Sequence, residues 1–391
     1  MAEIRPVASG PETRTSAPGQ SWLRAAVVGL LLFIFLCGIR GMSTGFEGLG
    51  GDVLGTFFQA TENPFVALVV GILATTLMQS SSVTTSMVVA LVAAPDNPLP
   101  IANAIPMIMG ANIGTTVTNT IVALGHMGRP EEFRRAYAAA TCHDFFNFLA
   151  VAVLLPLEIM TGFLAKLSHT LAGVVGTGGG GKYPNPLKDA AKAVVNPVKD
   201  AIYGVIPGEQ LASLVMILVS MSVIFLALYY LVKLMRNAAA SRVKVYMTRA
   251  LDASPYIAML VGMVMTVIVQ SSSITTSLMV PLAGAGIVTL RQIFPVTLGS
   301  NIGTTMTALL ASMAAPQETA ALAVQIALVH LLFNLTGIAL IFTVPAIREI
   351  PLRAARGLAN LAVRSKKLAI LYLVFLFYVL PALLVAATRG W

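Results

Sequence analysis

The sequence predicts an all-α polytopic membrane protein with two inverted repeats, each containing a re-entrant helical hairpin and broken transmembrane helices. Composition is the first reason, because 57% of the 391 residues are hydrophobic and 10% are charged, against about 25% charged in a soluble domain. An internal duplication is the second, and basic residues confined to short loops are the third. With a mean hydropathy of +0.84, the chain has too few polar residues for a water-facing surface, so we expect a lipid bilayer around it.

The formal net charge of +9 does not indicate nucleic-acid binding. Lys and Arg lie between apolar segments, and no compact basic domain remains outside them. Cytoplasmic loops of multi-pass membrane proteins have this excess of positive charge. The expected location is therefore the cell (inner) membrane.

The N-terminal region is expected to be a disordered cytoplasmic tail followed by a membrane span. Residues 1–21 are rich in Pro, Ser, Thr and Gly, and residues 22–42 contain an apolar run. No small-residue cleavage site follows that run, so we expect it to remain as the first span. Cys37 and Cys142 lie in apolar sequence and are interpreted as buried thiols.

Two parts of the chain repeat one another. The segment QSSSVTTS at 79–86 returns as QSSSITTS at 270–277, with seven of eight positions identical. GANIGTT at 110–116 returns as GSNIGTT at 299–305, and the pattern His-x-x-Phe-Asn begins at both His143 and His330. Three motifs in one order indicate a duplication that covers residues 63–168 and 254–347.

Each repeat begins with an apolar run that is too short to cross a membrane. The runs 65–78 and 256–269 would each cover about 21 Å as helix, against a hydrocarbon core of ~30 Å. A Gln-Ser-Ser-Ser motif ends each run and a second apolar half follows, which predicts a hairpin that enters the membrane and turns back. Irregular backbone at that depth requires a protein interior or a water-filled cavity. In repeat 1 we also expect a helix break at residues 112–114 and a long helix over about 133–167.

The remaining segments connect and flank the repeats. We expect an extracellular Gly-rich linker with a short amphipathic helix at 169–210, a span at 211–235, a basic cytoplasmic connector at 236–253, a basic cytoplasmic segment at 348–367 and a last span at 368–388.

Loop charges orient the two repeats. The loop with Arg129, Arg134 and Arg135 should be cytoplasmic, whereas residues 312–318 contain no Lys or Arg and should lie outside. These placements are compatible only if the repeats have opposite orientations, an arrangement found in secondary transporters.

The repeated motifs offer ligands for a small anion and for a small cation. Hydroxyl donors and free N–H groups at half-helix N-termini suit an oxyanion, and hydroxyl, amide and carbonyl oxygens suit sodium. Ser and Thr in membrane helices also make plain interhelical hydrogen bonds. Two matching copies, each at a predicted break within the membrane, favour a binding site.

Asp144 is an acidic residue in an apolar stretch, and such residues are functional candidates by default. Its counterpart in repeat 2 is Leu331, so this feature belongs to one repeat only. A cation-binding role is favoured over a pairing with His143 or with a basic loop residue. His143 and His330 are interpreted as packing and hydrogen-bonding residues, and Glu158 receives no special role.

Taken together, these motifs resemble those of the type II sodium/phosphate cotransporters. The resemblance rests on the paired Gln-Ser-Ser-Ser and Asn-Ile-Gly-Thr-Thr segments and on FRRA at 133–136 followed by HDFFN at 143–147, and it covers most of residues 63–347. The chain is similar to a bacterial member. The resemblance implies import of inorganic phosphate driven by the sodium gradient, with Na+ as the co-transported ion and no enzymatic activity.

The resemblance also implies that the two Gln-Ser-Ser-Ser motifs contribute to the substrate and sodium sites, and that Asn147, Ser300 and Thr304 match sodium-site positions. We therefore expect phosphate to be bound by Gln79, Ser80, Ser81, Ser82, Gln270, Ser271, Ser272 and Ser273. We expect sodium to be bound by Asn112, Thr115, Thr116, Asp144, Asn147, Ser300, Asn301, Thr304 and Thr305. Asp144 matches the acidic position that the family associates with electrogenic transport. One departure is His126-x-x-Arg129, where vertebrate relatives carry Gln-x-x-Asp in part of their sodium site.

Several alternatives stay open at this level. Another oxyanion, such as sulfate or arsenate, would suit the same groups, and a passive anion channel could use the same hairpins. The sequence contains no nucleophile–base–orienter set and no phosphate loop with a Lys, which argues against an intramembrane enzyme. The oligomeric state is open, with a homodimer as one option.

Overall fold

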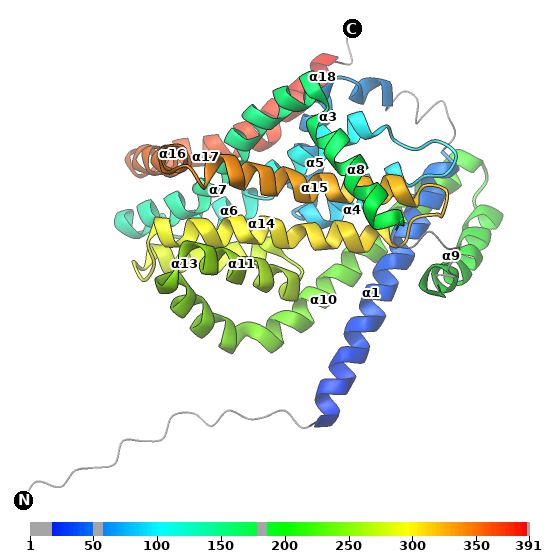
Figure 1. Cartoon of the computed structure of the whole chain (residues 1–391), viewed down its shortest axis with the longest axis horizontal. Helices are drawn as coiled ribbons and strands as arrows, with labels where there is room; N and C mark the ends of the chain where they lie inside the picture. The colour runs from blue at the N-terminus through cyan, green and yellow to red at the C-terminus, as the bar shows by residue number, and fades with distance from the viewer. Residues whose placement is uncertain (1–17, 50–57, 178–185, 389–391) are drawn as a thin grey trace, which may run out of the picture.

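The computed structural model describes residues 18–49, 58–177 and 186–388, and every regular element in these ranges is helical (Figure 1). Within them, seven helices are long and apolar enough to cross a membrane: Ala26–Glu47, Ile101–Leu124, Pro130–Thr161, Glu209–Leu231, Leu290–Ser312, Ala320–Ile341 and Lys366–Ala387. The predicted class of all-α polytopic membrane protein is therefore confirmed. Most of the predicted disordered tail and the Gly-rich part of the linker lie outside the described residues.

Repeat 1 comprises a hairpin, an interrupted helix and a long helix. The hairpin arms are α3 (Pro64–Met78) and α4 (Ser81–Val92). A two-residue turn separates α5 (Ile101–Gly114) from α6 (Val117–Leu124). The long helix α7 (Pro130–Thr161) follows, and α8 (Phe163–Thr177) comes after it.

The elements of repeat 2 follow the same order. The hairpin is α11 (Pro255–Val269) with α12 (Ser272–Ser277) and α13 (Met279–Gly284), and α14 (Leu290–Ser312), α15 (Ala320–Ile341) and α16 (Pro345–Arg364) follow. One difference from the prediction of broken helices is that α14 runs through its Asn-Ile-Gly-Thr-Thr segment without a break. Thr hydroxyls donate to carbonyls of their own helix in both copies, so these bonds do not account for the difference.

The predicted long helix is present as α7, but its predicted end at residue 167 is wrong, because α7 ends at Thr161. Gly162 adopts a left-handed conformation with φ +63°, which a residue without Cβ tolerates and which ends helices. The Glu158 carboxylate then accepts hydrogen bonds from the N–H groups of Leu164 (2.6 Å) and Ala165 (3.3 Å). Glu158 therefore caps the start of α8, a role that the sequence did not indicate.

The helices outside the repeats pack around them. The first span lies in α1 (Pro18–Glu47), which packs along α10 (Glu209–Ala253). The predicted span at 211–235 and connector at 236–253 are thus a single helix. The amphipathic helix of the linker is α9 (Pro186–Val205), which packs against α1 and α10. The last span consists of α17 (Lys366–Val374), a π-helical segment (Phe375–Val379) and α18 (Leu380–Thr388).

The two hairpins open toward opposite ends of the helix bundle. At one end, the Gly284 carbonyl at the close of α13 accepts a hydrogen bond from Arg135 Nε near the start of α7 (2.9 Å). At the other end, the Ala93 carbonyl at the close of α4 accepts one from Thr319 Oγ1 at the start of α15 (2.7 Å). The first end contains the start of α14, since α13 comes just before it. The second end contains the end of α14, which is joined to α15 at residues 313–319. The two ends are therefore separated by the full length of α14.

Each hairpin is held against its repeat by close glycine contacts. A Cβ on Gly110 of α5 would collide with the Leu68 carbonyl of α3, and one on Gly299 of α14 would collide with the Met259 carbonyl of α11. Small residues let membrane helices approach until their backbones touch. Close helix packing therefore explains why both GANIGTT and GSNIGTT begin with a glycine.

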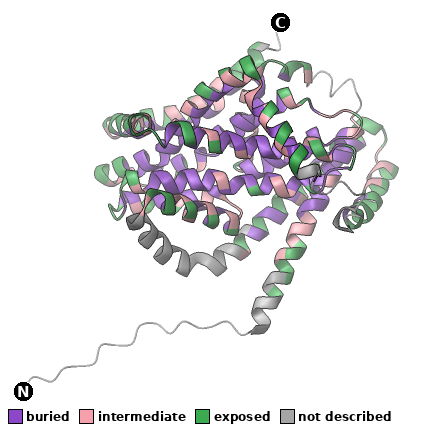
Figure 2. Cartoon of the chain, in the orientation of Figure 1, coloured by how far each residue is buried: buried purple, intermediate pink, exposed green. Residues whose placement is uncertain are grey.

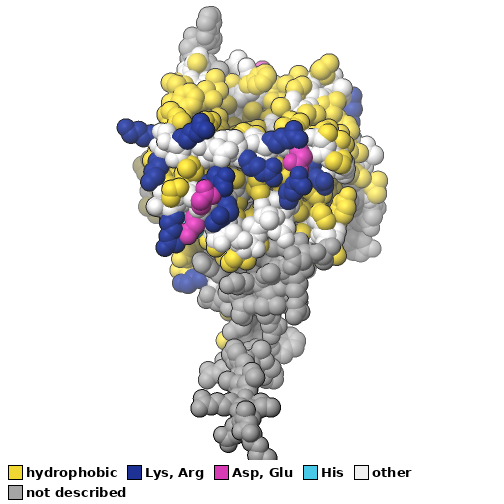
Figure 3. Space-filling view, turned by 90° about the vertical axis from the view of Figure 1, so that its left-hand side faces the viewer, with side chains coloured by type: hydrophobic (Ala, Val, Ile, Leu, Met, Phe, Trp, Pro, Cys, Tyr) yellow, Lys and Arg dark blue, Asp and Glu magenta, His cyan; other side chains and the backbone are white. Residues whose placement is uncertain are grey.

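Burial is greatest in the middle of the bundle (Figure 2), and α4, α5 and α14 are the most buried helices. The end that contains α16 and the start of α7 has many Lys and Arg side chains on its surface (Figure 3). Two stretches that the sequence predicted to share the cytoplasmic side, the loop of Arg129 to Arg135 and residues 348–367, lie at this same end, since α16 packs on α7.

Candidate functional site

The tips of both hairpins have the same unusual backbone. Among the described residues, Gln79 (φ 51°) and Gln270 (φ 55°) alone combine a side chain with a left-handed conformation. Such conformations cost about 1–3 kcal/mol and persist where surrounding contacts hold them in place, often at functional sites. Each Gln ends one arm, and the following Ser starts the next arm.

Equivalent hydrogen bonds stabilise the two tips. Ser80 Oγ accepts from the N–H of Val83 (3.3 Å) and Ser271 Oγ accepts from the N–H of Ile274 (3.4 Å), so each Ser caps the helix that it precedes. The Gln amides are also held alike. Gln79 Oε1 accepts from Thr118 Oγ1 and Gln270 Oε1 accepts from Thr307 Oγ1, both at 3.2 Å.

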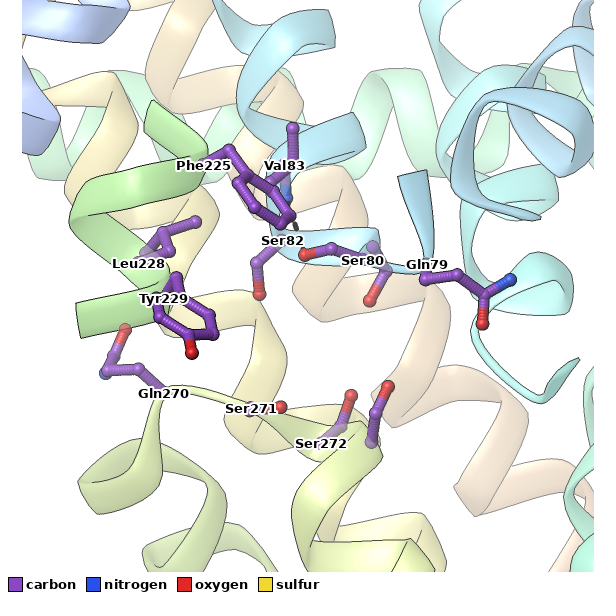
Figure 4. Close-up of a pocket in the computed structure, with 12 residues that line it drawn as sticks. Gln79, Ser80, Ser82, Val83, Phe225, Leu228, Tyr229, Gln270, Ser271 and Ser272 are labelled. Atoms are coloured by element: carbon purple, nitrogen blue, oxygen red, sulfur yellow. Dashed lines mark hydrogen bonds between the residues drawn. The ribbon is translucent and has the colours of Figure 1, made fainter. Parts of the chain in front are cut away.

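The two tips meet across one cavity of about 150 Å³. All eight residues expected to bind phosphate line it: Gln79, Ser80, Ser81, Ser82, Gln270, Ser271, Ser272 and Ser273. Figure 4 shows the two segments running in opposite directions, with the hydroxyls of Ser82 and Ser272 pointing into the space between them. The cavity is smaller than the ~300–1,000 Å³ of typical small-molecule sites, which suits a small ion.

The cavity wall is polar but uncharged. No Lys, Arg, Asp or Glu is among its lining residues. The first-turn N–H groups of a helix lack intrahelical acceptors, and here the starts of α4 and α12 lie at the cavity together with serine hydroxyls. These groups can bind an anion through donors and a sodium ion through oxygens, without a permanent countercharge that would hold either one.

One wall of the cavity was not foreseen from the sequence. Phe225, Leu228 and Tyr229 of α10 close one side of it (Figure 4). The Phe225 and Tyr229 rings are stacked with centroids 6.4 Å apart. The helix lies between the repeats and carries no copy of their motifs, so self-similarity could not reveal these residues.

The expected sodium residues lie in the buried interior and do not line this cavity. Several form one network that joins the repeats. Asn301 Nδ2 donates to Asn147 Oδ1 (3.1 Å), Asn147 Nδ2 donates to the Asn112 carbonyl (2.7 Å), and His143 Nε2 lies 2.6 Å from Asn301 Oδ1. His143 is thus a hydrogen-bonding residue, as interpreted from the sequence.

Ser300 connects this interior to the cavity. Its hydroxyl accepts from Thr266 Oγ1 (2.8 Å) and donates to the carbonyl of the cavity residue Ser272 (3.5 Å). The remaining expected hydroxyls donate to carbonyls three or four residues earlier in the chain and keep lone pairs free to accept or to bind a cation; they belong to Thr115, Thr116, Thr304 and Thr305.

Asp144 is fully buried and is contacted by a helix outside the repeats. Its Oδ2 accepts a hydrogen bond from Tyr372 of α17 (2.8 Å). The other oxygen, Oδ1, is buried without a hydrogen-bond partner among the described residues, so it remains available to a cation. Tyr372 was missed from the sequence because nothing in the last span distinguishes it from an interfacial tyrosine.

The described residues form a polytopic membrane protein with an uncharged polar cavity between the tips of two helical hairpins, an arrangement typical of secondary transporters. The comparison with protein families then names the group. The model of the Na+/Pi-cotransporter family matches residues 34–174 and 223–363, and the chain belongs to this family.

Curated relatives agree with this assignment. The chain is 34% identical to sodium-dependent phosphate transport protein 2A of Ovis aries, over 95% of this chain and 69% of the relative. It is 34% identical to the 2A protein of Rattus norvegicus, over 97% and 71%. It is 33% identical to the 2B protein of Homo sapiens, over 92% and 64%. No solved structure matches the chain. The type II resemblance is therefore confirmed, and these relatives are transporters rather than enzymes.

Proposed function

We propose that this protein is a sodium-coupled phosphate transporter that binds phosphate between its two Gln-Ser-Ser-Ser tips and imports it by alternating access. The relatives are sodium-dependent phosphate transport proteins, and the match spans both repeats. The observation that carries the assignment of the site is the meeting of both motifs, 191 residues apart in sequence, at one cavity.

The cavity chemistry supports phosphate as the anion. Hydroxyl and backbone N–H donors from two directions can surround a tetrahedral oxyanion, as helix N-termini do in other phosphate sites. The absence of a fixed positive charge in the lining favours reversible binding. It also leaves charge balance to the sodium ions, which lower the cost of bringing an anion into the membrane.

Sodium would bind among the buried oxygens next to the cavity. Candidate ligands are the side chains of Asn112, Thr115, Thr116, Asp144, Asn147, Ser300, Asn301, Thr304 and Thr305. The bond from Ser300 to the Ser272 carbonyl offers a physical link between the two ions. Asp144 adds one negative charge to one repeat alone, which supports electrogenic transport.

Opposed hairpins support alternating access. The arms of the two hairpins extend to their tips from opposite ends of the bundle. Small opposite movements of the two repeats could therefore open the same cavity to either side. The basic end would face the cytoplasm of a bacterial cell, with the protein in the inner membrane. A homodimer is one possible assembly, and the transport site itself requires only one chain.

The test is uptake of labelled phosphate by purified protein in proteoliposomes, with an inward sodium gradient and simultaneous current recording. We expect uphill accumulation that ceases when potassium replaces sodium. Equal uptake in both salts would contradict sodium coupling. Competition by sulfate and by arsenate would separate phosphate from other oxyanions, and dissipation without accumulation would indicate a channel.

A further inference from the structure

A second cavity, of about 470 Å³, lies at the basic end of the bundle. It is formed where the start of α7, the loop before α14 and the amphipathic helix α16 meet. None of its lining residues belongs to the Gln-Ser-Ser-Ser tips or to the buried asparagine network. The proposed transport site therefore leaves this cavity without a role.

Four arginines surround this cavity: Arg134 and Arg135 of α7, Arg291 of α14 and Arg356 of α16. Two carboxylates balance part of their charge. Glu131 pairs with Arg134 (2.6 Å), and Glu349 lies 2.8 Å from Arg291 and 3.8 Å from Arg356. Four positive charges against two negative ones leave an excess of two.

Arg135 is the arginine best placed for a ligand. It makes no ion pair among the described residues, and its Nε donates to the Gly284 carbonyl (2.9 Å). This bond holds the side chain at the contact between α7 of repeat 1 and α13 of repeat 2. The flat guanidinium fork matches two oxygens of a phosphate group, and arginine is the residue preferred for that contact.

The rest of the lining is mostly apolar. Ala138, Ala283, Val288, Leu290 and Ala359 contribute to the wall, and Asn360 lies beside Arg356 at the exposed surface. A free phosphate ion gains nothing from apolar walls, whereas a phospholipid places a phosphate next to acyl chains. Basic pockets between membrane helices on the cytoplasmic side are suited to anionic lipid headgroups.

We propose that this cavity binds the headgroup phosphate of an anionic phospholipid from the leaflet at the basic end of the protein. The lipid would contact α7 of repeat 1, α14 of repeat 2 and α16 at once. It would thereby stabilise the packing of the two repeats at this end.

The proposal is tested with the full-length purified chain by measuring its thermal unfolding midpoint in detergent. Phosphatidylglycerol should raise the midpoint and phosphatidylcholine should not. The double variant R135Q/R356Q should lose at least half of the phosphatidylglycerol-induced shift. Arg353→Gln is the matched control, because Arg353 is exposed on the same helix but does not line the cavity.

A second variant keeps every arginine. Asn360→Trp places a large side chain at the exposed rim and should also remove the lipid-induced shift. Persistence of the full shift in either cavity variant, or an equal loss in the Arg353 control, would overturn the proposal. A parallel titration with inorganic phosphate separates the two sources of the group. If R135Q/R356Q abolished the phosphate-induced shift and left the lipid-induced one, the cavity would be a free-phosphate site.

Discussion

At the scale of single residues, the left-handed backbone of Gln79 and Gln270 is the feature that shapes the site. Together with the extended Ser80 and Ser271 that follow, it turns the chain between the two arms, and the next helix starts at the cavity. The two glutamine side chains make matching bonds to Thr118 and Thr307, which hold the reversal in place. The two tips thus share a geometry, although the helices that follow them, α4 and α12, differ in length.

Serine hydroxyls at the cavity should contribute directly to ion affinity. Ser81→Ala and Ser272→Ala each remove one buried hydroxyl. The side chain of Ser81 is 5% exposed and that of Ser272 is 4% exposed. A hydrogen bond to a charged group contributes about 1.5–3 kcal/mol, so we expect the concentration of phosphate or sodium for half-maximal uptake to rise about tenfold or more. Ser222→Ala on the exposed face of α10 is the control. Unchanged affinities in both cavity variants would argue against this site.

The carboxylate of Asp144 should set the charge moved with each phosphate. Asp144→Gly removes one negative charge from the buried interior, and we expect less net charge to enter per phosphate. The measurement is the ratio of current to labelled-phosphate flux in the same proteoliposomes. A ratio equal to that of the unmodified protein would contradict the role assigned to Asp144.

At the scale of helices, backbone contact between the hairpin arm and its neighbour positions each tip. Gly110 and Gly299 occupy equivalent places in the two repeats and touch carbonyls of α3 and α11. The tips are therefore held by main-chain packing as well as by the polar bonds at their ends. Helix α10, outside the repeats, adds the aromatic wall.

Adding one methyl group at this contact should destabilise the protein. Gly299→Ala places a Cβ against the Met259 carbonyl, and overpacking of this kind costs about 1–3 kcal/mol. We expect a lower thermal unfolding midpoint and reduced uptake. Gly357→Ala on α16 meets nothing within 4 Å and should be neutral. Equal behaviour of the two variants would disprove the close-packing explanation.

At the scale of the whole molecule, the two hairpins and the basic side chains distinguish the two ends of the bundle. The hairpins open at opposite ends, and basic side chains concentrate at one of these ends (Figure 3). The membrane orientation that follows from the positive-inside rule can be measured directly.

Single cysteines should report the two sides of the membrane. In a background in which the buried Cys37 and Cys142 are replaced by alanine, Glu318→Cys should react with a membrane-impermeant maleimide added to intact cells. Arg129→Cys should react only after the cells are opened. The reverse pattern would invert the proposed topology, and labelling of both residues from one side would exclude it.

The membrane-protein class and the two hairpin tips could be predicted from the sequence. Composition indicated a membrane protein, and its apolar runs indicated helices, because a helix satisfies all the backbone hydrogen bonds of a segment that lies in lipid. The duplication identified both tips as candidates, since the same eight-residue pattern could be recognised without any contact information. The tertiary structure decided which residues meet. The cavity wall from α10, the bond from Tyr372 to Asp144 and the cap made by Glu158 all depend on contacts between segments with no shared pattern. Such contacts arise only when the helices pack, and for this reason periodicity and charge could not reveal them.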